Sequence, residues 1–456
     1  MTTTITARAR TPRAAAAPAA HGRAPGPQER TLWLVLLAWT AAWAALAAVG
    51  GGYSWHYFAR GADLLTHPGA PGAGLQLYAS NPELQIGPLA LVAAVPFHSL
   101  GPSAGRFATE LVLALLGPVL LRVLSGARAG LSGRRPPASL VLVTGLVVLP
   151  VWCQVATHFA HLDDALALAF AVGAVWAAAR QYPYLTALLV AGAVDSKPWA
   201  LGFAALVLMF PPWQRSRVAA LFGAGVAAAW LPFVIAAPQT LGAAGFAIDS
   251  TPDSALRALG VHAATTPAWD RPAQLLVGVL VAAVCVRRGR WYAVPLTVVT
   301  ARLLLDPQTY PYYSSGLLLC AAVVDLLGSR RPLPVWSAAA GTWYLVNDLA
   351  GRLLLPEQVG AVRAMFCIGV LVALCVPVGR EHRRAQRRVA TCSPHRWGAA
   401  RFGSPLRSIS ASEPHSSMTI GDGPGAELHD AGTGGRGRGV PCGGGASRSG
   451  ERRLRR

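Results

Sequence analysis

Long apolar runs, separated by short polar stretches, recur along the chain from Thr31 to Pro377. The runs are continuous and rich in alanine and leucine, and polar and apolar positions do not alternate within them. Continuous runs of this kind favour helices over the strands of a membrane barrel. Because a bilayer core requires about 20 apolar residues per helix, with a range of about 17–25, the pattern predicts a polytopic helical membrane protein.

Thirteen apolar segments stand out in this pattern. We expect helices near residues 31–51, 87–100, 107–124, 139–156, 164–179, 184–196, 199–213, 218–237, 273–286, 291–305, 312–328, 335–347 and 359–378. The fold class predicted from them is all-α, a transmembrane bundle of about 12 helices within a range of 10–13.

Arginine positions predict which side of the membrane each loop occupies. Arginines cluster between the expected helices at 122–135, 180, 215–217, 287–290, 330–331 and 380–388. Thirteen crossings would leave the arginine-rich N-terminus outside, against the positive-inside rule. Segment 87–100 is too short to span and contains Pro88 and Pro96, so we expect an interfacial or re-entrant helix there. Twelve crossings then place both termini in the cytoplasm, and ten remain if 184–213 does not cross twice.

The net charge of +20 lies largely in two tails. Residues 1–30 contain five arginines and one glutamate, and residues 379–456 contain fifteen arginines and six acids. Both tails are poor in large apolar side chains, so we expect disordered cytoplasmic tails around a membrane domain at 31–378. Positive-inside anchoring explains this charge better than nucleic acid, and no nucleic-acid partner is expected.

Cysteines and the N-terminus exclude two further classes. The seven cysteines are scattered without a CxxC pair, so neither a disulfide framework nor a zinc site is indicated. Residues 1–30 lack the apolar centre of a cleavable signal peptide, so the first helix is expected to act as the insertion signal. No phosphate-binding loop or dinucleotide fingerprint appears in a suitable context, which makes nucleotide-driven chemistry improbable.

Acidic residues are distributed unevenly in the expected topology. Of the thirteen acids in residues 31–378, twelve fall on or near the outer side, and only Asp325 falls toward the cytoplasm. Acids contribute little to membrane orientation, so the assignment rule did not impose this asymmetry. It predicts that the polar chemistry lies on the extracytoplasmic face.

The first outer loop, 52–86, contains a candidate general base. Asp63 follows the first expected membrane helix, and a carboxylate beside an apolar wall can accept a proton from a hydroxyl group. The structural alternative is a solvated acid or a helix cap. Tyr78 in the same loop is a candidate wall for a substrate.

A second candidate lies in HFAHLDDALALAF, residues 158–170. Asp163 is well placed as a helix N-cap, and both Asp163 and Asp164 suit the N-terminus of a helix. A metal site built from His158, His161 and an aspartate is an alternative of low specificity. We expect a cap combined with a polar site.

Lys197, in VDSKPWALGF, is the only lysine in a chain with 39 arginines. A compact ammonium suits a phosphate as a point charge, whereas a guanidinium suits flat two-pronged contacts. The structural alternatives are snorkelling to the membrane surface and a simple pair with Asp195. Phosphate contact and snorkelling both remain open.

Two later outer loops add charged and aromatic residues. Residues 238–272 carry Arg257, Trp269 and Arg271, and residues 305–316 carry Tyr310 and Tyr312. An aromatic belt at the membrane surface is the structural alternative for these rings. As functional candidates, the arginines would contact a phosphate and the aromatic rings would line a substrate site.

Short motifs along residues 31–378 resemble the membrane glycosyltransferases of the GT-C superfamily. They are GADLL at 61–65, LQLYASNPELQIGPLAL at 75–91, HLDDALALA at 161–169 and SKPWAL at 196–201. More narrowly, the chain is similar to the polyprenol-phosphate-mannose-dependent mannosyltransferase-like family, glycosyltransferase family 87. The usual acidic pair of other GT-C enzymes is not visible in the first loop.

The resemblance implies transfer of a sugar, with mannose favoured, from a polyprenyl phosphate to a lipid or glycan hydroxyl at the outer face of the plasma (inner) membrane. It implies Asp63 as the catalytic acid, with Asp163 or Asp164 as the alternative base. Lys197 and His161, with Arg257 or Arg271, would hold the donor phosphate. No cofactor is expected beyond the lipid donor, and dependence on a divalent metal stays open. The rival function is a multi-pass transporter or lipid flippase.

Overall fold

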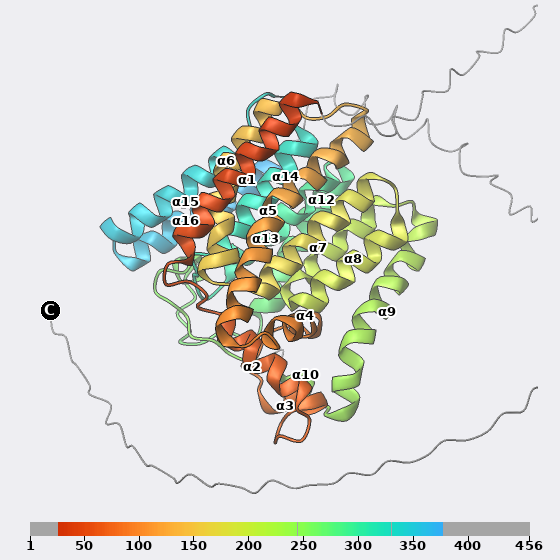
Figure 1. Ribbon diagram of the computed structural model, residues 1–456, viewed down its shortest axis with the longest axis vertical. Coiled ribbons are helices and arrows are strands. Elements are labelled where there is room, and N and C mark those ends of the chain that lie inside the picture. Colours follow the sequence, from red (N-terminus) through yellow and green to blue (C-terminus); the bar gives the residue numbers. More distant parts are fainter. Residues whose placement is uncertain (1–25, 244, 330, 377–456) are drawn as a thin grey trace, which may run out of the picture. The chain divides into compact units, whose positions relative to one another are not determined.

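The computed structural model of the protein describes residues 26–243, 245–329 and 331–376 (Figure 1). The chain divides into two units, Met1–Ser393 and Pro394–Arg456, and all described residues lie in the first. The expected tails therefore fall almost entirely outside the described residues. At the N-terminal boundary, helix α1 begins at Pro27, before the expected start at Thr31. Proline is well suited to this first helical position because it needs no hydrogen-bond partner for a backbone N–H.

Within the described residues, each of the thirteen expected apolar segments contains a helix. Within the described part of the chain, the only pairing of extended backbone is one antiparallel bridge between Asp249 and Thr265. The all-helical fold is thus confirmed for these residues. In the part of the chain that the structure describes, six helical segments are long and apolar enough to cross a membrane: α1 (Pro27–Ala48), α5 (Pro102–Ser132), α6 with η2 (Ala138–His158), α7 (Leu162–Ala179), α9 (Pro212–Ala236) and α16 (Pro356–Cys375).

The remaining helices are shorter or less apolar, so a total of about twelve crossings stays a prediction. They are α2 (Trp55–Thr66), η1 (Gly74–Gln76), α3 (Leu77–Ser80), α4 (Pro88–His98), α8 (Pro183–Ser196), η3 (Pro198–Met209), α10 (Thr240–Ala243), α11 (Ala255–Ala258), α12 (Asp270–Arg287), η4 (Trp291–Ala293), α13 (Val294–Leu305), α14 (Tyr313–Gly328) and α15 (Val335–Leu353).

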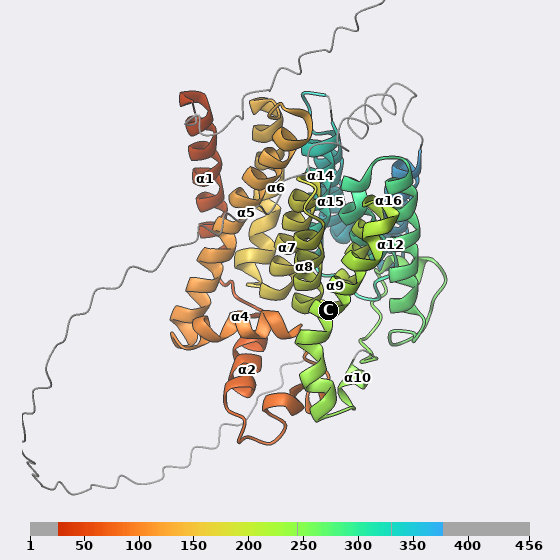
Figure 2. The ribbon, with the colours of Figure 1, turned by 90° about the vertical axis from the view of Figure 1, so that its right-hand side faces the viewer.

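Helix α4 covers the segment expected not to cross. It has 11 residues, and Figure 2 shows it running across the direction of α5, α6 and α7. Its length and direction agree with an interfacial or re-entrant helix. Its position relative to a membrane stays a prediction.

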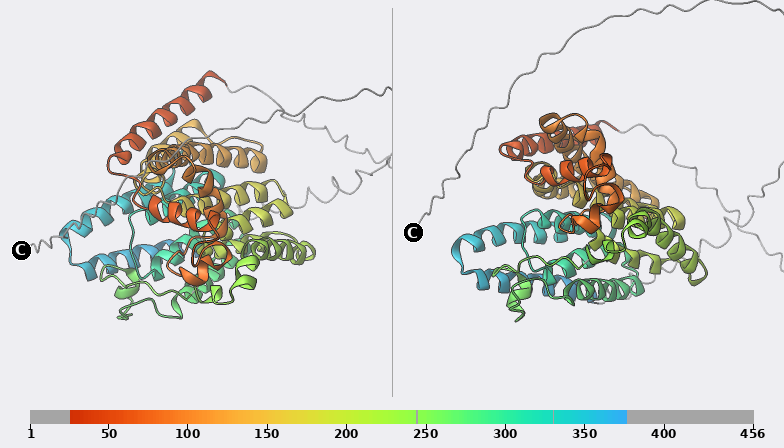
Figure 3. Two further views of the ribbon diagram at one scale, coloured as in Figure 1. Left: turned by 60° about the horizontal axis from the view of Figure 1, so that its bottom comes forward. Right: turned by 90° about the horizontal axis from the view of Figure 1, so that it is seen from below.

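Helix α7 lies in the interior of the bundle and α9 at its edge. Helix α7 packs against α5 and α8, and 72% of its most apolar window is buried, against 11% for α9. Figure 1 shows α9 alongside the bundle, and Figure 3 shows α15 and α16 running as a neighbouring pair. An apolar helix with so little buried surface matches a lipid-facing position, whereas α7 can present polar groups to the protein interior.

Asp325, the only acid expected toward the cytoplasm, has a structural role. It is fully buried near the end of α14, and its carboxylate accepts hydrogen bonds from the backbone N–H groups of Trp336 (3.2 Å) and Ser337 (2.6 Å). These groups belong to the first turn of α15, where a negative charge is stabilising. Asp325 thus joins the two helices.

Candidate active site in a buried cluster of charges

The first turn of α7 carries two carboxylates and follows an irregular stretch of backbone. The preceding η2 (Gln154–His158) is π-helical, and Ala160 adopts φ 47°, which residues with a Cβ atom rarely take. His161 is the N-cap residue, while Asp163 lies inside the turn and accepts the backbone N–H of Asp164 at 2.8 Å. The expectation that Asp163 is the N-cap is therefore wrong, because His161 occupies that position.

The irregular stretch places the His161 ring against both acids. Its Nε2 atom lies 3.1 Å from Asp164 Oδ2 and 3.4 Å from Asp163 Oδ1. Asp163 is fully buried and Asp164 is 4% exposed. Burying an ionised carboxylate is unfavourable unless cations and hydrogen bonds compensate, so the partners of these two acids determine whether they can carry charge.

Lys197 supplies one compensating cation. It follows α8 in an extended conformation, and its Nζ donates a hydrogen bond to Asp163 Oδ2. Its side chain is only 15% exposed, so the ammonium points into the protein, which disfavours snorkelling. The ammonium therefore pairs with Asp163 and not with Asp195, the alternative partner. One of the buried carboxylate oxygens of Asp195 lacks a hydrogen-bond partner.

Arg302 of α13 supplies a second cation and joins two acids. Its Nη1 lies 3.4 Å from Asp164 Oδ1, and its Nε lies 3.3 Å from Asp306 Oδ2. The guanidinium also stacks near the rings of Trp199, at 4.6 Å, and Tyr313, at 4.2 Å. A flat, weakly hydrated guanidinium is suited to such ring contacts.

Trp199 and Tyr312 complete this group of side chains. The indole N–H of Trp199 donates to Asp164 Oδ1 at 2.7 Å, and the centroid of the Tyr312 ring lies 4.2 Å from that of His161. We use the term polar cluster for the set consisting of His161, Asp163, Asp164, Lys197, Trp199, Arg302, Asp306, Tyr312 and Tyr313. Its members come from α7, the α8–η3 junction, α13 and the start of α14.

The charges within the polar cluster are nearly balanced. Three carboxylates, those of Asp163, Asp164 and Asp306, face the permanent cations of Lys197 and Arg302. Burial raises the pKa of Asp306, while the Arg302 guanidinium acts in the opposite direction. The cluster is therefore a network in which each of the three acids lies beside a cation.

Three members of the cluster also form a candidate metal site. His161, Asp163 and Asp164 offer ligand atoms that all lie within 4.8 Å of one another. Imidazole and carboxylate suit several divalent cations. A bound dication would add to the charges of Lys197 and Arg302, and it would have to displace Lys197 from Asp163. The set is therefore a weaker cation site than its composition suggests.

Asp63 lies in a separate and more exposed place. It sits near the end of α2, its side chain is 56% exposed, and it lies 3.0 Å from His67 Nδ1 and 3.7 Å from His98 Nε2. Among the described residues, its ion pairs are thus with these two histidines, and His161 and Lys197 meet at Asp163 instead. The structure brings together two of the three residues expected to converge.

The expected aromatic residues differ in their exposure and contacts, and of these only Tyr312 belongs to the polar cluster. Tyr78 is 1% exposed, donates to Ile86 O at 2.8 Å and packs against Trp230, so its ring offers no free face. Trp269 is exposed at the start of α12. Tyr310 stacks on Tyr312, with 5.4 Å between ring centroids, at the surface above the cluster.

The two expected arginines differ in their surroundings. Arg271, in the first turn of α12, donates to Gln85 Oε1 at 3.1 Å and to Phe246 O at 2.6 Å. Arg257 lies in the short helix α11, where its backbone N–H is capped by Ser254.

A half-buried ion pair outside the polar cluster, between Asp253 and Arg363, fixes the loop between α9 and α12. Arg363 of α16 donates to Asp253 Oδ2 at 3.0 Å and to Asn347 Oδ1 at 2.6 Å, and Thr309 donates to Asp253 Oδ2 at 2.7 Å. Burial alone would raise the pKa of Asp253. Hydrogen bonds from Thr309 and Thr251, together with the Arg363 charge, instead bring it below its ordinary value. The pair ties this loop to the segment that carries the cluster tyrosines.

Sequence reasoning missed Arg302 and Trp199. Arg302 stands alone in the apolar run VPLTVVTARLLL, and an ionisable residue inside such a run is a signal for a buried partner. Trp199 lies two residues after Lys197, in the SKPWAL motif. Its indole N–H predicts a polar partner if the ring is buried, but nothing in the sequence identifies Asp164 as that partner.

Comparisons of the chain with protein-family models, curated proteins and solved structures found no match.

Proposed function

We propose that the protein is an integral membrane glycosyltransferase that takes a sugar, with mannose favoured, from a polyprenyl phosphate and passes it to a hydroxyl group of a lipid or glycan. The observation that carries the proposal is the polar cluster, where two buried carboxylates lie beside a lysine, a histidine and an arginine. This combination provides both a base for a hydroxyl and donors for a phosphate.

Asp164 is the preferred general base in this proposal, with Asp163 as its support. Asp163 is engaged by Lys197, whereas Asp164 Oδ2 has the imidazole of His161 as its neighbour at 3.1 Å and lacks a conventional hydrogen bond. The acceptor oxygen would form a bond to the anomeric carbon of the sugar while its proton passes to Asp164. The bond between that carbon and the phosphate oxygen would break, and the polyprenyl phosphate would leave with the electron pair.

Lys197 is suited to the leaving phosphate even though it is already paired. An ammonium has three N–H donors, and the contact with Asp163 uses one of them. The two other N–H donors of Lys197, together with donors from His161 and Arg271, would stabilise the charge that develops on the phosphate. A lysine can thus bridge an acid and a phosphate, which gives a reason for a single lysine among 39 arginines.

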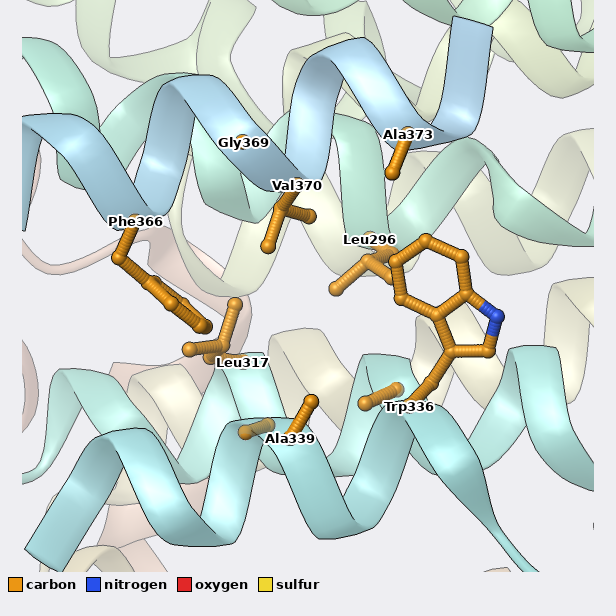
Figure 4. A pocket seen from close by; sticks show the side chains of 10 residues that line it. Leu296, Leu317, Trp336, Ala339, Phe366, Gly369, Val370 and Ala373 are labelled. Atoms are coloured by element: carbon orange, nitrogen blue, oxygen red, sulfur yellow. The ribbon is translucent and has the colours of Figure 1, made fainter. Parts of the chain in front are cut away.

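An apolar pocket on two of the helices that carry the cluster, α13 and α14, suits the lipid chain of the donor. The pocket has a volume of about 280 Å³ and is lined by Leu296, Leu317, Ala321, Trp336, Ala339, Ala340, Phe366, Gly369, Val370 and Ala373. Figure 4 shows these apolar side chains pointing toward one another from facing helices. Leu296 precedes Arg302 on α13, and Leu317 follows Tyr313 on α14. A head group at the cluster could therefore extend its chain along the same two helices.

A proton-coupled transporter is the second candidate. Buried acids, a histidine and paired cations among apolar helices also form proton relays in pumps and transporters. The burial of Asp163 and Asp164 in the first turn of α7 supports this alternative. It requires solute movement and predicts no covalent product.

The deciding experiment uses the full chain, purified and reconstituted in liposomes with polyprenyl-phosphate mannose and a panel of glycolipid acceptors. Formation of a mannosylated lipid that is lost in Asp164→Asn would support the proposal. The matched control is Asp348→Asn, because Asp348 is exposed and pairs with Arg352 on the surface of α15. If no donor and acceptor combination yields product while the liposomes accumulate a solute, the transporter is the better account.

A further inference from the structure

The space beside Asp164, Trp199 and Arg302 is too small for a ligand larger than water. The space lined by Asp164, Trp199, Arg302, Tyr312 and Tyr313 has a volume of about 10 Å³. A single water requires about 10–15 Å³, and a phosphate group with an attached sugar is many times larger. At least one of these side chains must therefore move before a head group can enter.

Trp199 is the member of the cluster most able to move. It is half-buried, and a single hydrogen bond joins it to Asp164, while its ring stacks near Arg302 and Phe203. Arg302, by contrast, is held by two acids, and Tyr312 is buried among other aromatic rings. Removal of Trp199 would uncover both the carboxylate and the guanidinium.

The helix that carries Trp199 has an unusual conformation. Helix η3 is a 3₁₀-helix of 12 residues, whereas runs longer than three or four residues are uncommon and long ones often mark a hinge or strain. Its sequence, PWALGFAALVLM, is rich in alanine and leucine, which favour the α-helix. The same residues therefore have a second helical form available at low cost.

A change between these two forms would turn Trp199. Each residue rotates by about 120° in a 3₁₀-helix and by about 100° in an α-helix, so conversion of even one turn redirects its side chains. Lys197 is extended (φ −149°, ψ 117°) and separates α8 from η3. At the other end, Arg215 donates to Phe210 O and Leu208 O, both at 2.8 Å, and holds the end of η3 against α9. Rotation is thus most readily taken up at the Trp199 end.

We propose that the first turn of η3 is a gate that rotates Trp199 away from Asp164 and Arg302 and so admits the phosphorylated head group of a lipid. The identity of this ligand rests on the proposed function, whereas the motion of η3 does not. The gate keeps the cluster dry until a lipid-linked substrate takes the place of the indole.

The close contact between η3 and α13 provides a way to lock the gate. A Cβ atom added at Gly202 would lie 3.4 Å from Val298 Cβ, close to the separation of about 3.5–4.5 Å found in disulfides. The double variant Gly202→Cys/Val298→Cys also removes the valine methyl groups that such a Cβ would meet. Gly202→Cys/Val298→Ser is the matched control, because it has nearly the same volumes and cannot form the bond.

The first measurement is hydrogen exchange of the full chain in lipid nanodiscs, which requires no activity. We expect backbone amides of η3 to exchange about tenfold or more faster than those of the adjacent α8, since local opening exposes them. Oxidation of the double variant should slow exchange in η3, and dithiothreitol should restore it. Equal protection of η3 and α8, with no effect of the lock, would overturn the gate.

The second measurement is mannose transfer by the same variants. Oxidation of the double variant should lower the transfer rate about tenfold or more, reversibly, and leave the serine control unchanged. Full activity of the oxidised form would overturn the gate and leave the glycosyltransferase proposal intact. If no variant transfers sugar but η3 exchanges rapidly and the lock slows it, the gate stands and the proposed function fails.

Discussion

The two sets of acids that the sequence singles out have opposite environments. Asp63 is more than half exposed and lies between two histidines, whereas Asp163 and Asp164 are buried and held by Lys197 and Arg302. An exposed ion pair contributes about 0–1 kcal/mol, but breaking a buried one costs about 3–5 kcal/mol because it leaves a charge without a partner. Burying Asp163 and Asp164 together with their cations costs solvation energy. Such clusters of buried charge are typical of functional sites, which favours this pair of acids over Asp63.

Removal of the Lys197 ammonium should cause the largest loss of sugar-transfer activity. Lys197→Gln should lower transfer about 100-fold or more, because Asp163 loses its cation and the leaving phosphate loses a donor. Lys197→Arg should recover only part of the rate, since a planar fork does not replace a point charge at Asp163. The steady-state rate of sugar transfer in liposomes measures the effect of both substitutions. An arginine variant with the parental rate would show that any cation suffices.

Loss of the guanidinium should have the largest effect on stability. Arg302→Leu leaves Asp164 and Asp306 short of a buried cation, and we expect a loss of about 3–5 kcal/mol in the free energy of unfolding. The matched control is Arg352→Leu, because Arg352 is exposed and pairs with Asp348 on the surface. In this control variant, the free energy of unfolding should fall by less than about 1 kcal/mol. Chemical denaturation in detergent micelles measures both, and equal losses would contradict the contrast between buried and exposed pairs.

Trp199→Phe should lower the free energy of unfolding by a smaller amount than Arg302→Leu. The variant keeps most of the ring but removes the N–H that donates to Asp164, and a hydrogen bond to a charged group contributes about 1.5–3 kcal/mol. The same denaturation experiment measures this loss. A variant as stable as the parent would mean that Asp164 does not depend on the indole.

The smallest expected effect is a pH dependence of stability that arises from the pair of Asp253 and Arg363. The pKa of Asp253 is lowered in the folded protein, so its contribution to stability is present above the unfolded value of about 3.9 and is lost as the pH falls through the lower folded value. The midpoint of thermal unfolding of the parent should therefore fall more steeply below about pH 4 than that of Asp253→Asn. Parallel curves would remove Asp253 from the stabilising network.

The helices could be predicted from sequence because an apolar run of Ala and Leu determines them locally. The short length of 87–100, now α4, was predictable for the same reason. The partners of Lys197 were not, because Asp163 lies 34 positions away and no periodicity links an ammonium after α8 to a carboxylate in α7. Arg302 was visible as a lone charge, but its connection to Asp164 exists only once α7 and α13 are packed in the same bundle.

The most direct test of the central claim compares two single substitutions in one transfer assay. Asp164→Asn and Asp63→Asn would be reconstituted at equal amounts and supplied with the same polyprenyl-phosphate mannose and acceptor. The buried cluster as reaction centre predicts a loss of about 100-fold or more for Asp164→Asn and a rate within about twofold of the parent for the exposed Asp63→Asn. The reverse order of these two rates would contradict it.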